Sequence, residues 1–237
     1  GNAAAARAAL ATANGGPPTA AARAARSLAD GLLLTLDAPS ATAAARLGQA
    51  MAVDHPAGLV MPDSAPALIT LAALHAGDPV RARSVIGRAV RTGGDALFEQ
   101  RHRLLLSWVR MQDGQLSAAG AELTATDRLH RRDALWAAAL RTAIARRGGD
   151  PGAAAKHWYA AMEVLAEYSV DLFALLPLGE LWMAAARMGQ QDRLAPMLDT
   201  AFAILAELGD PVSWSVPLHW AGVHAGILAN DPAAVAP

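Results

Sequence analysis

The stretch DALWAAALRTAIARRGGDPGAAAKHWYAAMEVLAEY, residues 133–168, decides the fold of this chain. Its first half places Trp136, Leu140 and Ile144 at the spacing of one helix face. The turn Gly149-Asp150-Pro151 follows, in which glycine supplies a left-handed helix cap, aspartate can cap the next helix, and proline fits that helix's first turn. The second half has helical spacing again. The stretch therefore predicts two antiparallel helices joined by a short turn.

Turns of this kind recur along the chain, with successive centres roughly 35 to 41 residues apart, which is typical of a helical repeat. Strand-like alternation of period two is nowhere sustained. These features predict an all-α fold, a tetratricopeptide-like right-handed α-solenoid of antiparallel helix pairs. The turns are Gly77-Asp78-Pro79, Asp113-Gly114-Gln115, Gly149-Asp150-Pro151, Gly189-Gln190-Gln191-Asp192 and Asn230-Asp231-Pro232. The predicted helices are Leu68–Ala76, Val80–Arg91, Phe98–Met111, Leu116–Leu129, Asp133–Arg147, Gly152–Tyr168, Asp171–Met188, Arg193–Leu208 and Trp214–Ala229.

We expect the 237-residue chain to have two parts. Residues 1–64 form an Ala-rich helical N-terminal part of the array, which ends in a proline-containing loop at His55–Pro66. Residues 65–237 form the tetratricopeptide-like repeats. Because a partner helix should begin where the last turn stands, we expect the array to be truncated within its last repeat. The helices predicted for the N-terminal part are Ala3–Ala13, Thr19–Leu36 and Ala41–Val53.

Composition and charge argue against several classes of protein. The formal net charge is −1 and no block of five like charges occurs, so we expect no contact with nucleic acid. The chain has no cysteine and its N-terminus lacks the pattern of a signal peptide, which favours a cytoplasmic location. The uncharged stretch Val212–Asn230 is about long enough to cross a bilayer. Its histidine, serine, proline and glycine residues favour a buried helix instead, and we expect no membrane contact.

Sequence motifs for covalent chemistry are absent. The only lysine, Lys156, is not in a phosphate-binding loop, and no nucleotide, serine-hydrolase or zinc-protease motif can be written from the sequence. His219 and His224 are about 140° apart around a helix, unlike paired metal ligands. We therefore expect no catalytic residue, no cofactor and no metal site. An all-α enzyme with two carboxylates in a tryptophan-lined cavity stays an alternative.

The six tryptophans all fall in the repeat half, mostly on first helices, which usually line the concave face of a two-helix solenoid. Packing between repeats is the alternative role for each ring. Trp220 and His224 are four residues apart and share a helix face. Flat rings beside carboxylates and arginines are what sugar recognition needs. The candidate ligand-binding residues are Arg101, Trp108, Asp133, Trp136, Trp158, Tyr159, Asp171, Glu180, Trp182, Trp214, Trp220 and His224.

From about Ala65 to Pro237 the chain resembles a known family. The Gly-Asp-Pro turns, the arginine-rich and lysine-poor composition, and the stretches Trp136–Asp150, His157–Leu178 and Pro217–Asp231 are similar to the helical-repeat sensor segment of large actinobacterial transcription regulators of the maltose-regulator type. Such regulators carry an ATPase module upstream and a LuxR-type DNA-binding domain downstream. This chain has neither a phosphate loop nor a DNA-reading helix-turn-helix, so ATP and DNA would belong to the parent protein.

The resemblance implies that a small inducer binds in the concave groove and shifts the parent regulator to its active state. The implied inducer is an α-linked gluco-oligosaccharide such as trehalose or maltotriose. The implied partners are the flanking ATPase and DNA-binding modules. The alternative is a tetratricopeptide-type scaffold whose groove takes a peptide or a partner domain; the lysine-free first helices favour the small ligand.

Overall fold

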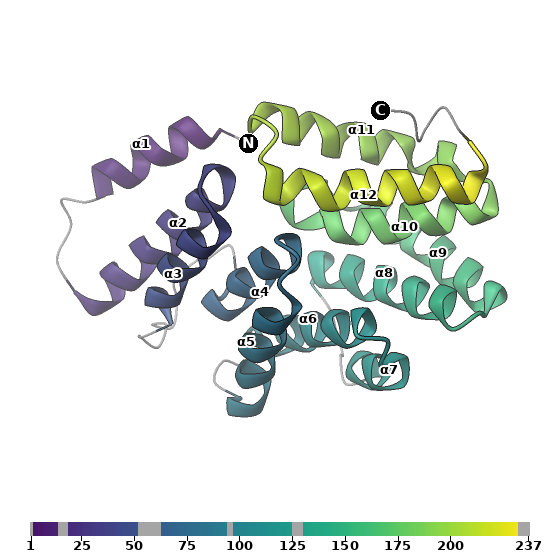
Figure 1. Ribbon diagram of the computed structural model, residues 1–237, viewed down its shortest axis with the longest axis horizontal. Coiled ribbons are helices and arrows are strands. Elements are labelled where there is room, and N and C mark those ends of the chain that lie inside the picture. Colours follow the sequence, from purple (N-terminus) through teal and green to yellow (C-terminus); the bar gives the residue numbers. More distant parts are fainter. Residues whose placement is uncertain (1, 14–18, 52–62, 94–96, 125–129, 232–237) are drawn as a thin grey trace.

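The computed structural model describes residues 2–13, 19–51, 63–93, 97–124 and 130–231, whose secondary structure is helical, with no strand among them. The prediction of an all-α protein is therefore confirmed (Figure 1). The α-helices are α1 (Ala3–Ala13), α2 (Ala20–Asp37), α3 (Ser40–Ala50), α4 (Ala65–His75), α5 (Pro79–Thr92), α6 (Glu99–Gln112), α7 (Leu116–Thr124), α8 (Arg131–Arg147), α9 (Pro151–Ala166), α10 (Leu175–Met188), α11 (Gln191–Glu207) and α12 (Val212–Ala229).

The turn between α8 and α9 has the predicted geometry. Gly149 is left-handed, with φ of +76°. Asp150 Oδ1 accepts a hydrogen bond from the backbone N–H of Ala153 at 2.8 Å, and Pro151 begins α9. The turn between α4 and α5 repeats this arrangement, with Asp78 as the capping residue. The Gly-Asp-Pro motif thus ends one helix and starts the next.

Two helix starts differ from the prediction by three or four residues, and the others by two at most. Pro66 lies in the first turn of α4 and not in a loop, because Ser64 caps that helix by accepting a hydrogen bond from Ala67 N–H at 3.2 Å. Asp171 caps a short 3₁₀ turn, Leu172–Ala174, so α10 begins only at Leu175. Residues 52–62 of the predicted loop, the break at 14–18, the C-terminal part of the predicted helix Leu116–Leu129, and Pro232 lie outside the described residues.

Neighbouring helices pack as pairs: α2 with α3, α4 with α5, α6 with α7, and α8 with α9. The first members α4, α6, α8 and α10 also contact one another in succession. The last part differs, because α10 packs more extensively on α12 than on α11. In Figure 1 the helices α10, α11 and α12 accordingly lie side by side at one end of the molecule.

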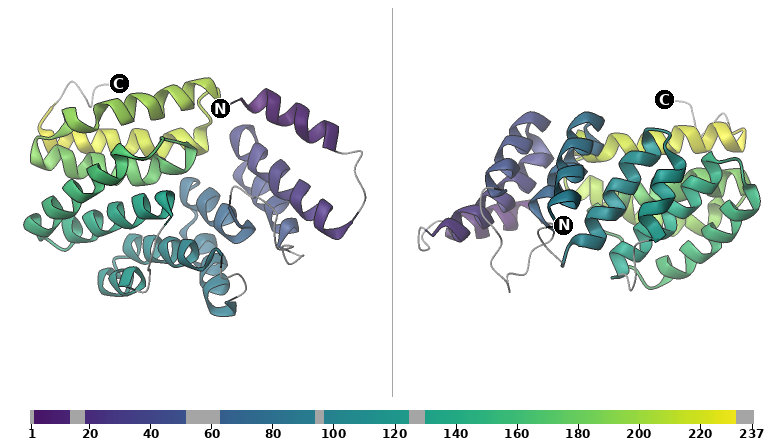
Figure 2. Two further views of the ribbon diagram at one scale, coloured as in Figure 1. Left: turned by 180° about the vertical axis from the view of Figure 1, so that it is seen from behind. Right: turned by 90° about the horizontal axis from the view of Figure 1, so that it is seen from below.

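The chain curves until α12 meets the N-terminal helices α2 and α4 (Figures 1 and 2). At this closure, Trp214 Nε1 donates a hydrogen bond to Thr35 Oγ1 at 2.9 Å, across 179 residues of sequence. The Trp214 ring also lies 4.3 Å from the His75 ring, centroid to centroid. The inner surfaces of the first helices are therefore enclosed over part of their length.

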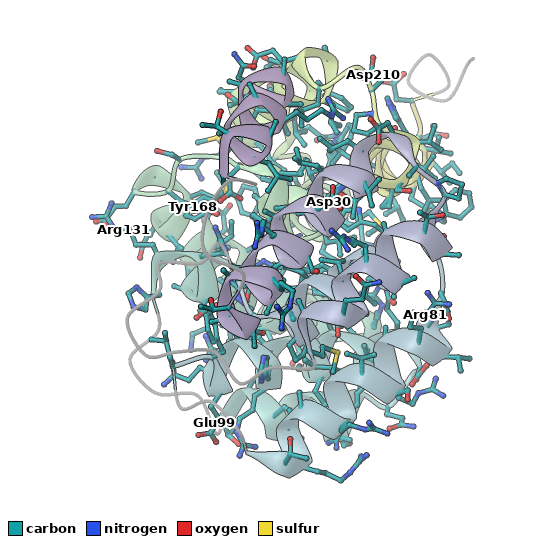
Figure 3. The ribbon with its side chains drawn as sticks, turned by 90° about the vertical axis from the view of Figure 1, so that its left-hand side faces the viewer. Asp30, Arg81, Glu99, Arg131, Tyr168 and Asp210 are labelled. Atoms are coloured by element: carbon teal, nitrogen blue, oxygen red, sulfur yellow. The ribbon has the colours of Figure 1, made fainter. Side chains whose placement is uncertain are left out.

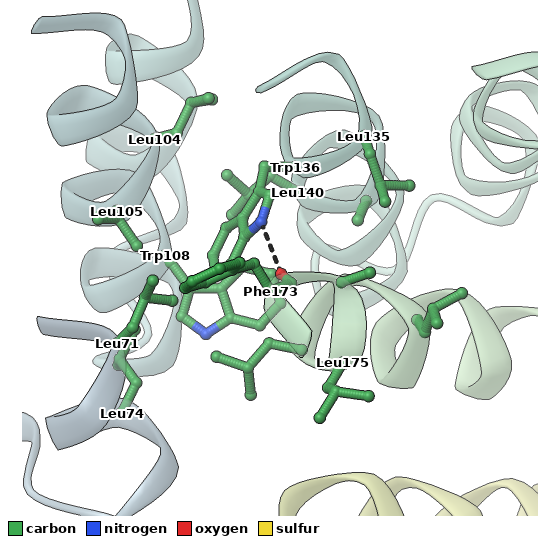
Figure 4. Close-up of a cluster of buried hydrophobic side chains, with 14 of the residues drawn as sticks. Leu71, Leu74, Leu104, Leu105, Trp108, Leu135, Trp136, Leu140, Phe173 and Leu175 are labelled. Atoms are coloured by element: carbon green, nitrogen blue, oxygen red, sulfur yellow. Dashed lines mark hydrogen bonds between the residues drawn. The ribbon is translucent and has the colours of Figure 1, made fainter. Parts of the chain in front are cut away.

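The enclosed region holds the aromatic core (Figure 4). Trp108 and Trp136 meet edge to face with ring centroids 4.9 Å apart, and Phe173 lies 6.1 Å from Trp214. Charged groups at the starts of α6 and α8 lie at the surface, as Glu99 and Arg131 do in Figure 3. Of the helices described, α12 included, none is both long and apolar enough to cross a membrane.

Candidate functional site

A cavity of about 300 Å³ lies between α6, α8, α10 and α12. It sits near the C-terminal ends of α6 and α8, against the first half of α10 and the middle of α12. Its apolar wall includes Leu175, Leu176, Met183 and Pro217. Its polar and aromatic residues are Trp108, Gln112, Arg146, Arg147, Glu180, Trp220 and His224.

An arginine pair and one carboxylate form the charged wall of the cavity. Glu180 is only 5% exposed, and its Oε2 accepts from Arg146 at 2.6 Å and from Arg147 at 2.8 Å. Arg147 also donates to Oε1 at 2.6 Å, so that it holds the carboxylate with two bonds. Two guanidinium groups against one carboxylate leave a net charge of +1 on the lining side chains.

Two buried N–H groups beside the cavity are unpaired. Among the described residues, neither Trp108 Nε1 nor Arg146 Nε has a hydrogen-bond partner. The Trp108 side chain is 1% exposed, whereas Trp136 next to it donates its own Nε1–H to the Phe173 carbonyl at 3.1 Å (Figure 4). A buried donor without a partner costs roughly 1–3 kcal/mol. Of the described buried polar atoms that lack a partner, these two donors are the ones on residues that line the cavity.

Trp220 and His224 line the α12 side of the cavity, and they share a helix face, as expected of residues four apart. Their ring centroids lie 4.5 Å apart with an interplanar angle of 66°. Trp220 is 64% exposed, so most of its indole surface is available to a ligand. The cavity is thus open on the side where an aromatic ring stands.

Small residues let α12 approach α10 closely enough to form this wall. A Cβ at Gly179 would lie 2.9 Å from the Ala221 Cβ. A Cβ at Gly222 would lie 2.6 Å from the outer edge of the Trp182 ring. Real Cβ atoms are not found at such distances, so both positions require glycine unless a helix shifts. The width of the cavity is therefore set by this glycine-lined contact.

The structure separates the predicted site residues into four groups. Four of them line the cavity: Trp108, Glu180, Trp220 and His224. Trp136, Trp158 and Trp214 are at most 1% exposed, which corrects the expectation that their rings face a groove. The Nε1–H groups of these three are bonded to the Phe173 carbonyl, the Leu181 carbonyl and Thr35 respectively. They are core residues because neighbouring helices cover them: Trp158 of α9 packs against α10, and Trp214 lies at the contact of α12 with α2 and α4.

Arg101, Asp133 and Asp171 belong to a buried ionic network and not to the cavity. Arg101 lies 2.8 Å from Asp133 and 3.5 Å from Asp63, and Arg132 pairs with Asp171 at 3.3 Å. Burial raises the pKa of Asp63, and the charge of Arg101 offsets part of that effect. This network joins the start of α4 to α6, α8 and the 3₁₀ turn. Its charged groups lie in ion-pair contact with one another, although Arg101 Nη1 and Asp63 Oδ2 have no hydrogen-bond partner among the described residues. The network therefore links the packing of these helices.

The last two predicted residues also lie away from the cavity. Tyr159 is 44% exposed and stands on α9, with the Arg193 guanidinium of α11 5.5 Å from its ring centroid. Trp182 packs edge to face on Phe202, with centroids 6.1 Å apart, and against Gly222. It therefore holds α10, α11 and α12 together.

Sequence reasoning missed the arginine pair and Gln112. Arg146 and Arg147 stand in the last turn of α8, where basic residues are common because they complement the helix dipole. Because arginine is common throughout the chain, these two residues did not stand out as candidate site residues. Two adjacent arginines directly before a repeat turn, with an acidic residue on the next first helix, are the feature that could have identified them.

Comparisons with known proteins add no relationship. No protein-family model matches the chain, and no significant match was found among curated proteins or solved structures. The functional assignment therefore depends on the site itself.

Proposed function

We propose that this chain is a ligand-binding helical-repeat module whose small ligand occupies the cavity between α6, α8, α10 and α12. The observation that carries the proposal is the combination of an exposed indole, Trp220, with two unpaired buried donors, Trp108 Nε1 and Arg146 Nε. The first offers a face on which a ring can stack, and the others offer hydrogen bonds that are free in this structure. Apolar walls with a few convergent polar groups are typical of small-molecule sites.

The size of the cavity limits the ligand. A volume of about 300 Å³ is at the lower end of the ~300–1,000 Å³ range of ligand pockets, which favours one or two sugar rings over a longer chain. Of the inducers suggested by the family resemblance, trehalose then fits better than maltotriose. We assign no covalent chemistry to the site.

The wider proposal follows from the same resemblance. The helix pairs would be units of a tetratricopeptide-like right-handed solenoid, and the module would be the sensor segment of a cytoplasmic transcription regulator. ATPase and LuxR-type DNA-binding modules of the parent protein would be its partners. The chain itself would contact neither nucleic acid nor a membrane.

Helix α12 provides a way for the ligand to act at a distance. Its middle carries Trp220 and His224 at the cavity, and its first turn carries Trp214 at the contact with α2 and α4. A ligand that binds one position of α12 better than another shifts the population of open and closed arrays. The N-terminal helices would then change their position relative to α12.

Calorimetric titration of the whole chain with trehalose, maltotriose and glucose tests the proposal, with tryptophan fluorescence followed in parallel. We expect saturable binding of at least one sugar and a fluorescence change that is lost in Trp220→Phe. The matched control is Tyr159→Phe, which alters an exposed ring of α9 outside the cavity lining. Binding without any contribution from Trp220, or silence across the panel, would argue against a ligand in this cavity.

A protein-binding scaffold is the second candidate, and a specific surface favours it. One face of α12 exposes Val212, Val216, Trp220 and Ile227, with exposed fractions of 74%, 53%, 64% and 60%. Contiguous apolar side chains of this kind are typical of interaction surfaces. The substitution Val216→Glu separates the two candidates, because it should leave sugar binding intact and weaken the docking of a partner protein.

A further inference from the structure

We infer that the ligand of this cavity carries an oxyanion, a carboxylate or a phosphate, on a small ring. The inference rests on the proposed function, since it concerns the occupant of the same site. It departs from the neutral gluco-oligosaccharide that the family resemblance implies. The argument comes from charge, from the inventory of free donors, and from the position of the apolar walls.

Charge is the first reason. Glu180 is the only acidic residue among those lining the cavity, and it faces both Arg146 and Arg147. One of the two positive charges is therefore not neutralised by the lining. The side chain of Arg146 is 11% exposed and that of Arg147 29%, so the charge of Arg146 is largely shielded from water while Arg147 is partly solvated. A charge in such surroundings attracts an anion more strongly than a charge at an open surface does.

The unpaired groups are the second reason. Both buried polar atoms of the lining that lack a partner among the described residues, Trp108 Nε1 and Arg146 Nε, are hydrogen-bond donors. The one carboxylate, Glu180, already accepts three bonds, which is most of the roughly four that a carboxylate can accept. Sugar hydroxyls need acceptors as well as donors. Gln112 and His224 of the lining can also accept hydrogen bonds. The two unpaired buried donors nevertheless suit a ligand group that only accepts, as a carboxylate or phosphate does.

The apolar walls place the rest of the ligand. Trp220 exposes its indole at the mouth, and Met183 and Pro217 also line the cavity. An oxyanion held near Arg146 would leave its attached ring to lie against these side chains. A bare inorganic ion would use only the polar wall.

The test is calorimetric titration of the full chain with four probes: glucose 6-phosphate, glucuronate, glucose and inorganic phosphate. We expect both acidic sugars to bind at least about tenfold more tightly than glucose, because hydrogen bonds to a charged group are stronger than those between neutral groups. Glucose 6-phosphate should also bind more tightly than phosphate alone. The affinity for both acidic sugars should fall when salt is added.

Two variants probe the donors separately. Arg146→Gln should reduce the affinity for glucose 6-phosphate about tenfold and leave that for glucose nearly unchanged, while Arg147 still holds Glu180. Trp108→Phe removes the indole N–H and keeps a ring, so it should also weaken acidic ligands. Arg88→Gln, an exposed arginine of α5, is the matched control. Circular dichroism and thermal unfolding verify that each variant folds.

The outcomes separate this inference from the function on which it rests. If glucose binds as tightly as the acidic sugars or more tightly, or if Arg146→Gln leaves the affinity for acidic sugars unchanged, the inference of an oxyanion is wrong. The cavity would then still be a sugar-binding site. If phosphate binds as tightly as glucose 6-phosphate, the inference that the ligand includes a ring is wrong. No binding by any of the four probes overturns the inference, and it contradicts the proposed function as well if trehalose and maltotriose also fail to bind.

Discussion

Tryptophans have different roles in two regions of the molecule: they pack in the aromatic core, and they line the cavity between α6, α8, α10 and α12. Trp136 and Trp214 of the core are at most 1% exposed, whereas Trp220 of the cavity is 64% exposed. In the aromatic core, the indole N–H groups of Trp136 and Trp214 are hydrogen-bonded within the protein. In the cavity, the N–H of Trp108 has no such partner among the described residues.

The difference follows from how far the neighbouring helices converge. At the first turn of α12, the helices α2 and α4 come close enough to cover Trp214. Further along α12, the arginine pair at the end of α8 faces α10 and leaves the cavity between them. Neighbouring tryptophans can therefore differ in role: the ring centroids of Trp108 and Trp136 lie 4.9 Å apart in the core, and of the two only Trp108 also lines the cavity.

The largest effect expected from this comparison comes from a matched pair of truncations. Trp136→Ala should lower the free energy of unfolding by about 3–5 kcal/mol, because a fully buried ring leaves a cavity that its neighbours cannot fill. Trp220→Ala should cost less than about 1 kcal/mol, because most of that ring already faces solvent. Urea unfolding of both variants is the measurement. Equal losses would contradict the division into core and cavity.

An intermediate effect is expected for Glu180→Gln. The substitution leaves Arg146 and Arg147 without their carboxylate, and we expect the free energy of unfolding to fall by about 2–3 kcal/mol. This is less than the ~3–5 kcal/mol expected for a fully buried pair, because the side chain of Arg147 is 29% exposed. Chemical denaturation measures it. Glu163→Gln, an exposed carboxylate of α9, serves as the control and should be nearly neutral. A neutral Glu180→Gln would show that the arginines are already solvated.

A smaller effect, dependent on pH, is expected at the closure. Burial lowers the pKa of His75 from 6.5 to about 3, and a hydrogen bond to the backbone of Ser213 opposes only part of this shift. The folded state holds this ring neutral, so the unfolded state binds one more proton between those values. The stabilising contribution is therefore present above pH 6.5 and is lost as pH falls, by up to about 1.4 kcal/mol per unit.

Unfolding free energies at about pH 7.5 and about pH 5.5 measure this slope. The variant His75→Gln cannot titrate at this position, so its stability should depend less on pH than that of the unaltered chain. The other histidines are present in both proteins and cancel in the difference. The same slope in both proteins would place the acid sensitivity elsewhere.

The sequence predicted the helices well and the site only in part. The turns at Asp78 and Asp150 define helix ends through local capping, which depends on neighbouring residues alone. The closure of α12 on α2 depends on contacts such as Trp214 with Thr35, which are far apart in sequence and have no local pattern. Trp136 and Trp214 were therefore expected in a groove and are found in the core.

The part of the cavity lining that comes from a single helix could be predicted from sequence spacing. Trp220 and His224 share a face of α12, and their spacing alone placed them together. Arg146 and Glu180 come from different helices, and only the packing of α8 on α10 brings them within 2.6 Å. Charges that meet across helices have no sequence spacing by which to be recognised.

The most direct test of the whole account is a nuclear magnetic resonance titration that follows the indole N–H signals of the six tryptophans. Single Trp→Phe variants assign the signals, and glucose 6-phosphate is the ligand. The account predicts that the signals of Trp108 and Trp220 move on binding, while those of Trp136, Trp158 and Trp214 stay in place. Movement confined to the three core indoles, or binding that leaves Trp108 and Trp220 unchanged, would contradict it.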